Sequence, residues 1–296
     1  MKLVQASLTA VTWFSIALFI FLYSPDSAQL SWKNRQSDWL VPYPIALAMC
    51  FFTAQLLKGF RWKRLTARIS TSDDSSILQY LWFFTLTSFS FLRLGELSKL
   101  AWALKRTSKQ TAVSLLAIEK FHDIAVLTTM LLVSCAALLL PRIWEPYLLA
   151  VLVGFAVTYQ WLPGLLSRIR LPGNEIQITQ RFNLEAFGET RRPASILSLL
   201  SWGMLLGGYY MSLIAIVPAP LTCALIMLCM VNFSGFLNLT PGNIGTYELA
   251  ASGVLIASGV STTNAIWFAI ELHFIILSMT FILGVGARGL IFLNSR

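Results

Sequence analysis

The chain has 296 residues, of which 56% are hydrophobic and only 12% are charged. A soluble domain carries about 25% charged residues, so this composition excludes an ordinary soluble protein and predicts an all-α polytopic membrane protein. The apolar runs are continuous rather than alternating, which excludes an outer-membrane barrel. The net charge of +9 comes from basic residues beside apolar segments, so we expect it to set membrane orientation and attract anionic lipid rather than bind nucleic acid.

Six apolar runs are candidate membrane spans, each of which needs about 20 residues. They are residues 7–23, 40–57, 111–140, 147–162, 196–217 and 265–293. The first run is followed by PDSA, a poor signal-peptide cleavage site, so we expect it to be retained. No polar segment reaches the roughly 50 residues of a separate domain. We therefore expect residues 1–296 to form a single integral membrane domain, with residues 167–194 as a cytoplasmic connector.

Basic residues predict the orientation of the chain. A group without any acidic residue follows the run 40–57, as is typical of a cytoplasmic loop: Lys58, Arg61, Lys63, Arg64 and Arg68. The segment 77–104 is followed by Lys105, Arg106 and Lys109, which also favour the cytoplasm. We therefore expect residues 77–104 to form a re-entrant hairpin that enters and leaves the membrane on the cytoplasmic side, and we expect a cytoplasmic N-terminus.

The segment 221–257 contains a second interruption of an apolar run. Arg288 and Arg296 favour a cytoplasmic C-terminus, and this orientation requires residues 221–257 to form a second hairpin, entered from the outer side. The two halves of the chain then run in opposite directions, as an inverted repeat. Many transporters have this arrangement, with the substrate site where the broken helices meet. The predicted fold has six full transmembrane helices and two re-entrant hairpins, in the inner (cytoplasmic) membrane.

The first break, at residues 91–99, places charged residues where the apolar run turns. On a helix that starts near Gly95, Glu96 and Lys99 share one face. The N-terminus of such a half-helix offers free N–H groups and a positive dipole end. With Arg93 as a bidentate donor, we expect it to bind a phosphate or carboxylate head group. The alternative is a structural ion pair at the membrane interface.

The start of the third span carries two carboxylates on one helix face. Glu119 and Asp123 are four residues apart, and we expect them to pair with the basic residues of the first break or to relay protons. We expect Lys120 to point elsewhere. The alternative is a structural ion pair, with Lys120 extending to the interface. We expect His122 to be an interface residue rather than a ligand.

The second break contains Pro241, Gly242 and Gly245, which stop one helix and permit a turn. We expect Thr246 to cap the following helix, and Glu248 to lie in its first turn, where negative charge is stabilised. The alternative is a tight turn with a charged cap.

The last span carries Glu271 and His273, which are two residues apart and so point to different faces. A carboxylate at that depth needs a partner or a cavity, so we weigh Glu271 above His273. The expected substrate-binding residues are Arg93, Gly95, Glu96, Lys99, Glu119, Asp123, Pro241, Gly242, Gly245, Glu248 and Glu271. The cysteine spacing matches no metal motif, and we expect neither a metal site nor a cofactor.

Three motifs in order carry a resemblance to a known family. They are Arg-x-Gly-Glu-x-x-Lys at 93–99, Glu-Lys-x-x-Asp at 119–123 and Pro-Gly-x-x-Gly-x-x-Glu at 241–248. Together they resemble the transmembrane domain of lysylphosphatidylglycerol synthases, a flippase-like family with stand-alone members, over roughly residues 40–293. Arg61-Trp62 is similar to the family pattern as well. The resemblance implies lipid translocation between leaflets, with phospholipids or polyprenyl-linked sugars as cargo.

Three functions compete. A lipid transporter fits the hairpins, the charges at depth and the resemblance, and without an ATP-binding motif its energy would come from a gradient or from proton coupling. A membrane enzyme is not expected, because the chain has no segment like the soluble catalytic domain of full-length synthases. The remaining alternative is a non-transporting membrane partner, or a lipid-binding subunit of a lipid or glycan synthesis system.

Overall fold

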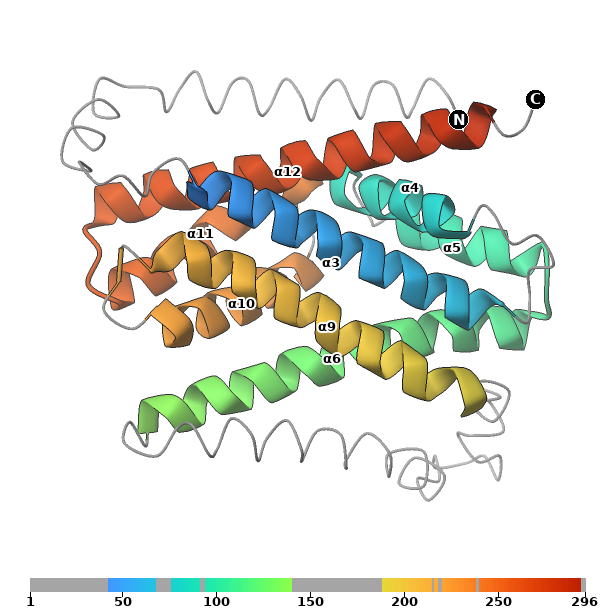
Figure 1. Cartoon of the computed structure of the whole chain (residues 1–296), viewed down its shortest axis with the longest axis horizontal. Coiled ribbons are helices and arrows are strands. Elements are labelled where there is room, and N and C mark those ends of the chain that lie inside the picture. Colours follow the sequence, from blue (N-terminus) through green and yellow to red (C-terminus); the bar gives the residue numbers. More distant parts are fainter. Residues whose placement is uncertain are drawn as a thin grey trace.

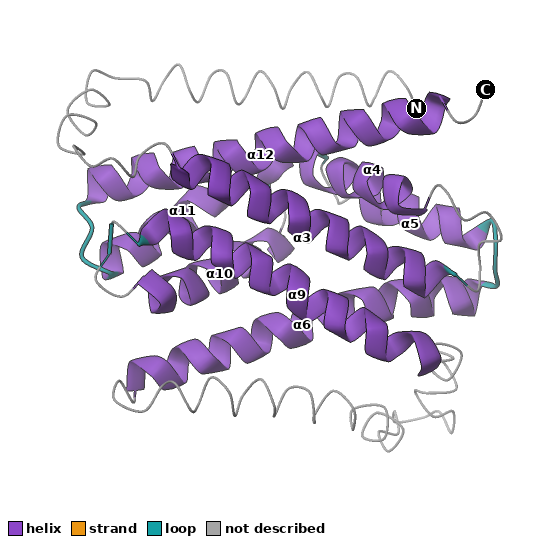
Figure 2. Ribbon diagram, viewed as in Figure 1, coloured by secondary structure: helices purple, strands orange, loops and turns teal. Residues whose placement is uncertain are grey.

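A computed structural model of the chain describes residues 42–67, 76–90, 94–139, 188–214, 216–217, 220–237 and 240–293. Every regular element in these ranges is a helix (Figure 2). The expected spans 7–23 and 147–162 lie outside them, as do Arg93, Arg296 and most of the connector 167–194. At the end of that connector, residues 188–194 already belong to a helix.

Four long helices run along the bundle axis (Figure 1). They are α3 (Pro42–Thr66), α6 (Lys109–Leu139), α9 (Gly188–Leu213) and α12 (Thr262–Leu293). By length and composition, α3, α9 and α12 can each cross a membrane. In α6 an equally long apolar helix is interrupted by Glu119, Lys120 and Asp123. The chain is therefore a helical, multi-pass membrane protein.

Two pairs of shorter helices enter the bundle from opposite ends (Figure 1). The first pair is α4 (Ser76–Phe89) and α5 (Leu94–Leu104), at the end where α3 finishes and α6 begins. The second pair is α10 (Pro220–Leu237) and α11 (Thr246–Ala257), joined through the short 3-10 helix η3 (Pro241–Asn243), at the other end. Each pair packs on itself, and η3 of the second break contacts α4 of the first pair.

The contacts between helices repeat in the two halves of the chain. Helix α3 packs along α9, and α4 packs on α12 as α10 packs on α6. Helices α3 and α4 meet as α9 and α10 do, and α5 meets α6 as α11 meets α12. Exchanging α3 with α9, α4 with α10, α5 with α11 and α6 with α12 therefore preserves these contacts. Because α3 and α9 run in opposite directions, the exchange also reverses the bundle (Figure 1).

Two glycines bring α4 close to its neighbours. A side chain at Gly95 on α5 would collide with Phe83 and Thr87 of α4, including their backbone atoms. A side chain at Gly284 on α12 would collide with Thr85, whose hydroxyl donates to the carbonyl of Thr280, 3.0 Å away. The first pair is thus fixed tightly between α12 and the charged helix α6.

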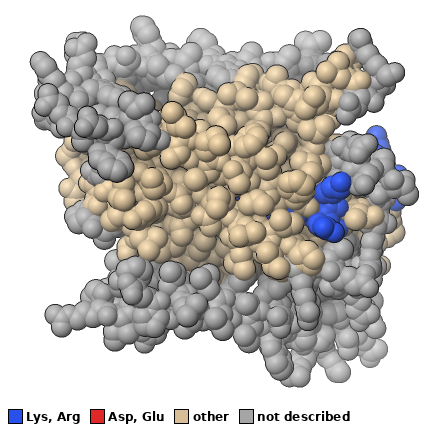
Figure 3. Space-filling model, in the orientation of Figure 1, with Lys and Arg blue, Asp and Glu red and all other residues tan. Residues whose placement is uncertain are grey.

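The outer surface is apolar. Large hydrophobic side chains point outward, for example Leu249 (76% exposed), Leu293 (64%) and Ile45 (62%). Such a surface suits hydrocarbon better than water. On the face shown in Figure 3, the Lys and Arg side chains of the described residues that can be seen lie at one end of the bundle. This is the end at which α3 and α12 finish and α6 and α9 begin.

Candidate functional site

Charged side chains from three helices meet inside the bundle. Arg61 on α3 forms a bidentate pair with Asp123 on α6, with Nη1–Oδ1 and Nη2–Oδ2 distances of 2.7 and 3.1 Å. Lys99 on α5 donates to Glu119 on α6 at 2.7 Å, and Arg61 lies 3.8 Å from the same carboxylate. Arg61, Lys99 and Glu119 are at most 2% exposed. Charges buried this deeply are tolerated only when they are paired.

Glu96, the third residue of α5, joins this network through Lys120 on α6. Its carboxylate accepts from Lys120 Nζ at 2.6 Å and lies 3.7 Å from Lys99 Nζ. The expectation that Lys120 points elsewhere is therefore wrong. Lys120 and its neighbour Glu119 both reach residues of α5, because the long aliphatic stem of Lys120 lets its ammonium turn back toward that helix. We call Arg61, Glu96, Lys99, Glu119, Lys120 and Asp123 the charged cluster.

Helix α9 completes the surroundings of the charged cluster. Arg61 also donates to the hydroxyl of Ser198 at 2.8 Å, and the indole N–H of Trp202 donates to Asp123 at 3.0 Å. The ammonium of Lys58 lies 3.9 Å from the centre of the Trp202 ring, within cation–π range. Arg61 and Lys58 are therefore buried inside the bundle. From the sequence alone we expect them only to mark a cytoplasmic loop.

The second break turns through backbone that favours glycine. Gly242 and Gly245 have φ values of 68° and 88°, and Asn243 between them has 57°. Glu248, the third residue of α11, accepts from the backbone N–H of Gly245 at 2.6 Å. The N-cap is Gly245 rather than the expected Thr246, whose hydroxyl instead donates to the carbonyl of Asn243 at 3.0 Å.

A second polar group joins α9, α11 and α12. Glu248 accepts from or donates to His273 Nδ1 across 2.7 Å, depending on protonation. The ring of Tyr247 stacks on His273 with 4.1 Å between centroids, and its hydroxyl lies 2.8 Å from that of Tyr209. From the sequence we weigh Glu271 above His273, but it is His273 that pairs with Glu248.

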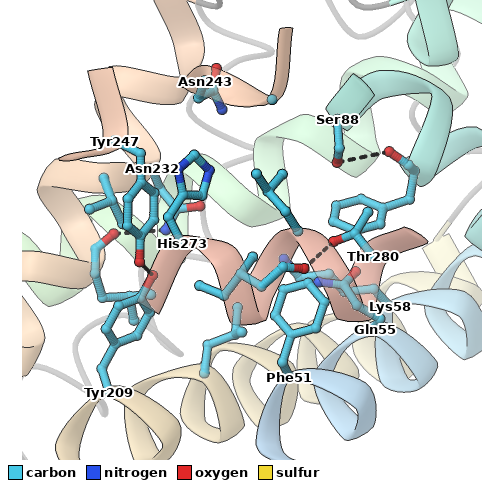
Figure 4. A pocket seen from close by; sticks show the side chains of 17 residues that line it. Phe51, Gln55, Lys58, Ser88, Tyr209, Asn232, Asn243, Tyr247, His273 and Thr280 are labelled. Carbon is cyan, nitrogen blue, oxygen red and sulfur yellow. Dashed lines mark hydrogen bonds between the residues drawn. The ribbon is translucent and has the colours of Figure 1, made fainter. Parts of the chain in front are cut away.

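Two adjoining hollows lie between the helix pairs and share part of their walls. The first borders the charged cluster, including Glu96, Lys99, Glu119, Lys120 and Asp123. The second borders Tyr209, Tyr247 and His273 (Figure 4). Their common wall consists of Lys58, Phe84, Ser88, Val231, Asn232 and Asn243. We call the two hollows together the central cavity.

The central cavity brings together only part of the expected site. Glu96, Lys99, Glu119, Asp123 and Gly242 line it. Among the residues that the structure describes, Gly95 lies against α4 and Pro241, Gly245, Glu248 and Glu271 are not part of its lining. Glu248 acts on the cavity through His273, which does line it. Arg93 lies outside the described ranges.

Several lining residues were not expected from the sequence: Lys58, Tyr209, Asn232, Asn243 and Tyr247. Tyr247 and Asn243 stand next to motif residues, which is the only local signal for them. Asn232 is an amide inside an apolar helix, a position where a polar side chain needs a partner or a cavity. Among the described residues no group of three or more His, Cys, Asp or Glu side chains is placed to hold a metal ion.

Comparison with known proteins agrees with the motifs. Searches of curated proteins and of solved structures returned no match. A family model described as "Lysylphosphatidylglycerol synthase TM region" matches residues 6–284, nearly the whole chain. The match includes both breaks and every helix that contributes to the central cavity. The chain therefore belongs to the family of the lysylphosphatidylglycerol synthase transmembrane region.

Proposed function

We propose that this protein is a lipid transporter, a flippase or scramblase that moves an anionic lipid or a polyprenyl-linked saccharide between the two leaflets. The observation that carries the proposal is the central cavity. Polar and charged side chains from both halves of the chain line it, deep inside a bundle with an apolar surface. A polar head group cannot cross hydrocarbon without a large cost, and this cavity offers it a polar route while the acyl chains remain in lipid.

The repeated helix contacts support an inverted repeat with two re-entrant hairpins. The pairs α4–α5 and α10–α11 are too short to cross a bilayer twice, and each begins and ends at its own end of the bundle (Figure 1). In transporters built this way the substrate binds where the broken helices meet. Here η3 of the second break contacts α4 of the first pair, and both contribute residues to the lining of the central cavity.

Two hydrogen-bonded pairs occupy equivalent places in the two halves. Glu96 is the third residue of α5, and its partner Lys120 is the twelfth residue of α6. Glu248 is the third residue of α11, and its partner His273 is the twelfth residue of α12. The partners are 24 positions apart in the first half and 25 in the second. This agreement supports a common plan for both halves, in which a carboxylate at the start of a short helix pairs with a residue on the following long helix.

The basic end of the bundle supports the orientation of the transporter. Lys63, Arg64, Lys105, Arg106 and Arg288 belong to segments at that end. By the positive-inside rule this end faces the cytoplasm, and the break between α10 and α11 is then entered from the outer side. We place the protein in the cytoplasmic membrane with its C-terminus inside.

Reconstituted liposomes test the proposal directly. The purified full chain is inserted into vesicles that contain a trace of head-group-labelled lipid, and a membrane-impermeant quencher reports how fast label leaves the inner leaflet. We expect faster exchange than in protein-free vesicles. Glu96→Gln and Glu248→Gln should each slow exchange about tenfold or more, because they leave the half-buried Lys120 and the buried His273 without their carboxylates. Lys109→Gln, at an exposed residue, is the matched control and should keep the full rate.

The double variant distinguishes one shared route from two separate effects. If both carboxylates serve a single cavity, the combined loss is smaller than the sum of the single losses in free energy. A reconstituted, folded protein that binds lipid but leaves exchange at the protein-free rate would overturn the proposal in favour of a non-transporting lipid-binding subunit.

A further inference from the structure

The charged cluster is balanced, and one buried cation remains beside it. Its three carboxylates, Glu96, Glu119 and Asp123, are each within 4.0 Å of a basic group: Lys120, Lys99 and Arg61 respectively. Three positive and three negative charges therefore cancel. Lys58 lines both hollows of the central cavity and is 8% exposed. In the described part of the chain its ammonium has no carboxylate within 4.0 Å and contacts only the Trp202 ring.

A ring is an incomplete partner for a buried ammonium. The group has three N–H donors, and its desolvation cost exceeds what one cation–π contact returns. The N–H edge of Trp202 is already bound to Asp123, so the ring is fixed and Lys58 rests on its face. The carboxylates that line the same hollow are each paired with another basic group, so the Lys58 ammonium has no direct ion-pair partner among the described residues.

Two unpaired amide oxygens lie on the same walls. Gln55, one helical turn before Lys58 on α3, is 2% exposed, and its Oε1 has no hydrogen-bond partner. Asn243 Oδ1, on the opposite side of the cavity, is likewise buried and unpaired. Figure 4 shows Gln55 and Lys58 next to each other, with Asn243 across the hollow. Buried polar atoms normally find partners, so these oxygens indicate a ligand with hydrogen-bond donors.

We propose that Lys58 anchors the phosphate of an anionic lipid head group that carries hydroxyls, with the amide oxygens of Gln55 and Asn243 accepting hydrogen bonds from those hydroxyls. This site rests on the proposed function and makes it more specific: the cargo is a singly anionic, hydroxyl-bearing lipid. The anion binds at Lys58 rather than at Lys99 of the first break, because Lys99 is already paired with Glu119. Beside the other hollow, Glu248 is bound by His273 and by the backbone N–H of Gly245, so it does not compete with the ligand for Lys58.

Equilibrium binding in detergent micelles tests the site without requiring transport. The probes are phosphatidylglycerol, with one phosphate charge and two hydroxyls, and phosphatidylcholine with the same acyl chains. We expect tighter binding of phosphatidylglycerol. Lys58→Met should weaken it roughly ten- to a hundredfold, as expected for a lost hydrogen bond to a charged group, and leave phosphatidylcholine within about twofold. The matched control Lys105→Met removes the same charge from an exposed turn and should bind like the unaltered chain.

Gln55→Glu provides a second, nearly isosteric variant. The new carboxylate lies one turn from Lys58 and should pair with it. We expect this variant to lose phosphatidylglycerol binding and to unfold at a higher temperature, because it supplies internally the anion that the ligand would bring. Even if Lys58→Met does not fold, wild-type phosphatidylglycerol affinity in Gln55→Glu overturns the site.

The remaining outcomes separate this site from the proposed function. A folded Lys58→Met protein with unchanged lipid affinities overturns the site, even if the protein still exchanges lipid between leaflets. Binding that depends on Lys58 without any exchange keeps the site and overturns the transporter. Displacement of phosphatidylglycerol by millimolar inorganic phosphate overturns the lipid assignment and gives the site to a soluble anion.

Discussion

The pair between Arg61 and Asp123 gives the sharpest test of how the bundle is held together. Arg61 is fully buried, and its guanidinium contacts Asp123, Ser198 and Glu119. Arg61→Met keeps a side chain of similar length and removes the fork. Asp123 then retains only the hydrogen bond from the Trp202 N–H. Breaking a buried pair from one side costs about 3–5 kcal/mol, so we expect a loss of that size in the free energy of unfolding.

The measurement is denaturant-induced unfolding in mixed micelles, followed by far-ultraviolet circular dichroism. Arg64→Met is the control: it removes the same group from an exposed position one turn later on α3, and it should change stability by less than about 0.5 kcal/mol. In the double variant Arg61→Met/Asp123→Leu no charge is left alone, so its loss should fall well below the sum of the single losses. Strictly additive losses, or an Arg61→Met protein as stable as Arg64→Met, would refute the account of the charged cluster.

Two further predictions concern the helix pairs. In a cysteine-free background, single cysteines that replace Arg64 and Lys105 should react with an impermeant reagent from the same side of the membrane. A cysteine that replaces Ser261 should react from the opposite side. Labelling of the first two positions from opposite sides would show that α4–α5 crosses the membrane. Gly95→Ala should destabilise the protein by about 1–3 kcal/mol, because the added methyl group collides with α4. Gly253→Ala places its methyl group in open space and should be neutral or stabilising. Equal shifts in the unfolding temperature of both variants would contradict the close packing of α4 and α5.

The positions of the helix breaks are largely visible in the sequence. The expected segments 77–104 and 221–257 differ by one residue from the described helix pairs, which span 76–104 and 220–257. The reason is physical: a charged or Gly-Pro interruption inside an apolar run has no stable place in hydrocarbon except against protein or water. The faces of α6 could be read in the same way, since Glu119 and Asp123 do point toward basic residues.

The partners of those charges were much harder to predict. Arg61 and Lys58 end an apolar run and are followed by Lys63 and Arg64, so all four fit a cytoplasmic loop equally well. Only tertiary packing shows that α3 continues to Thr66 and carries the first two inside the bundle. The pairs Arg61–Asp123 and Lys120–Glu96 join positions 62 and 24 residues apart, and no local rule of helix spacing connects them.

The two halves of the chain share a backbone plan but differ in charge, and the difference bears on how a head group is held. In the first half Glu96 pairs with Lys120, and Lys58 lines the cavity beside this charged cluster. In the second half it is Glu248 with His273, surrounded by Tyr247 and Tyr209, which offer hydrogen bonds but no fixed charge. An anion therefore gains Coulomb energy only on the side of α3, α5 and α6, and neutral hydrogen bonds on the side of α11 and α12. For the proposed head-group site, this asymmetry favours an anion beside Lys58, which lines both hollows together with Asn232 and Asn243.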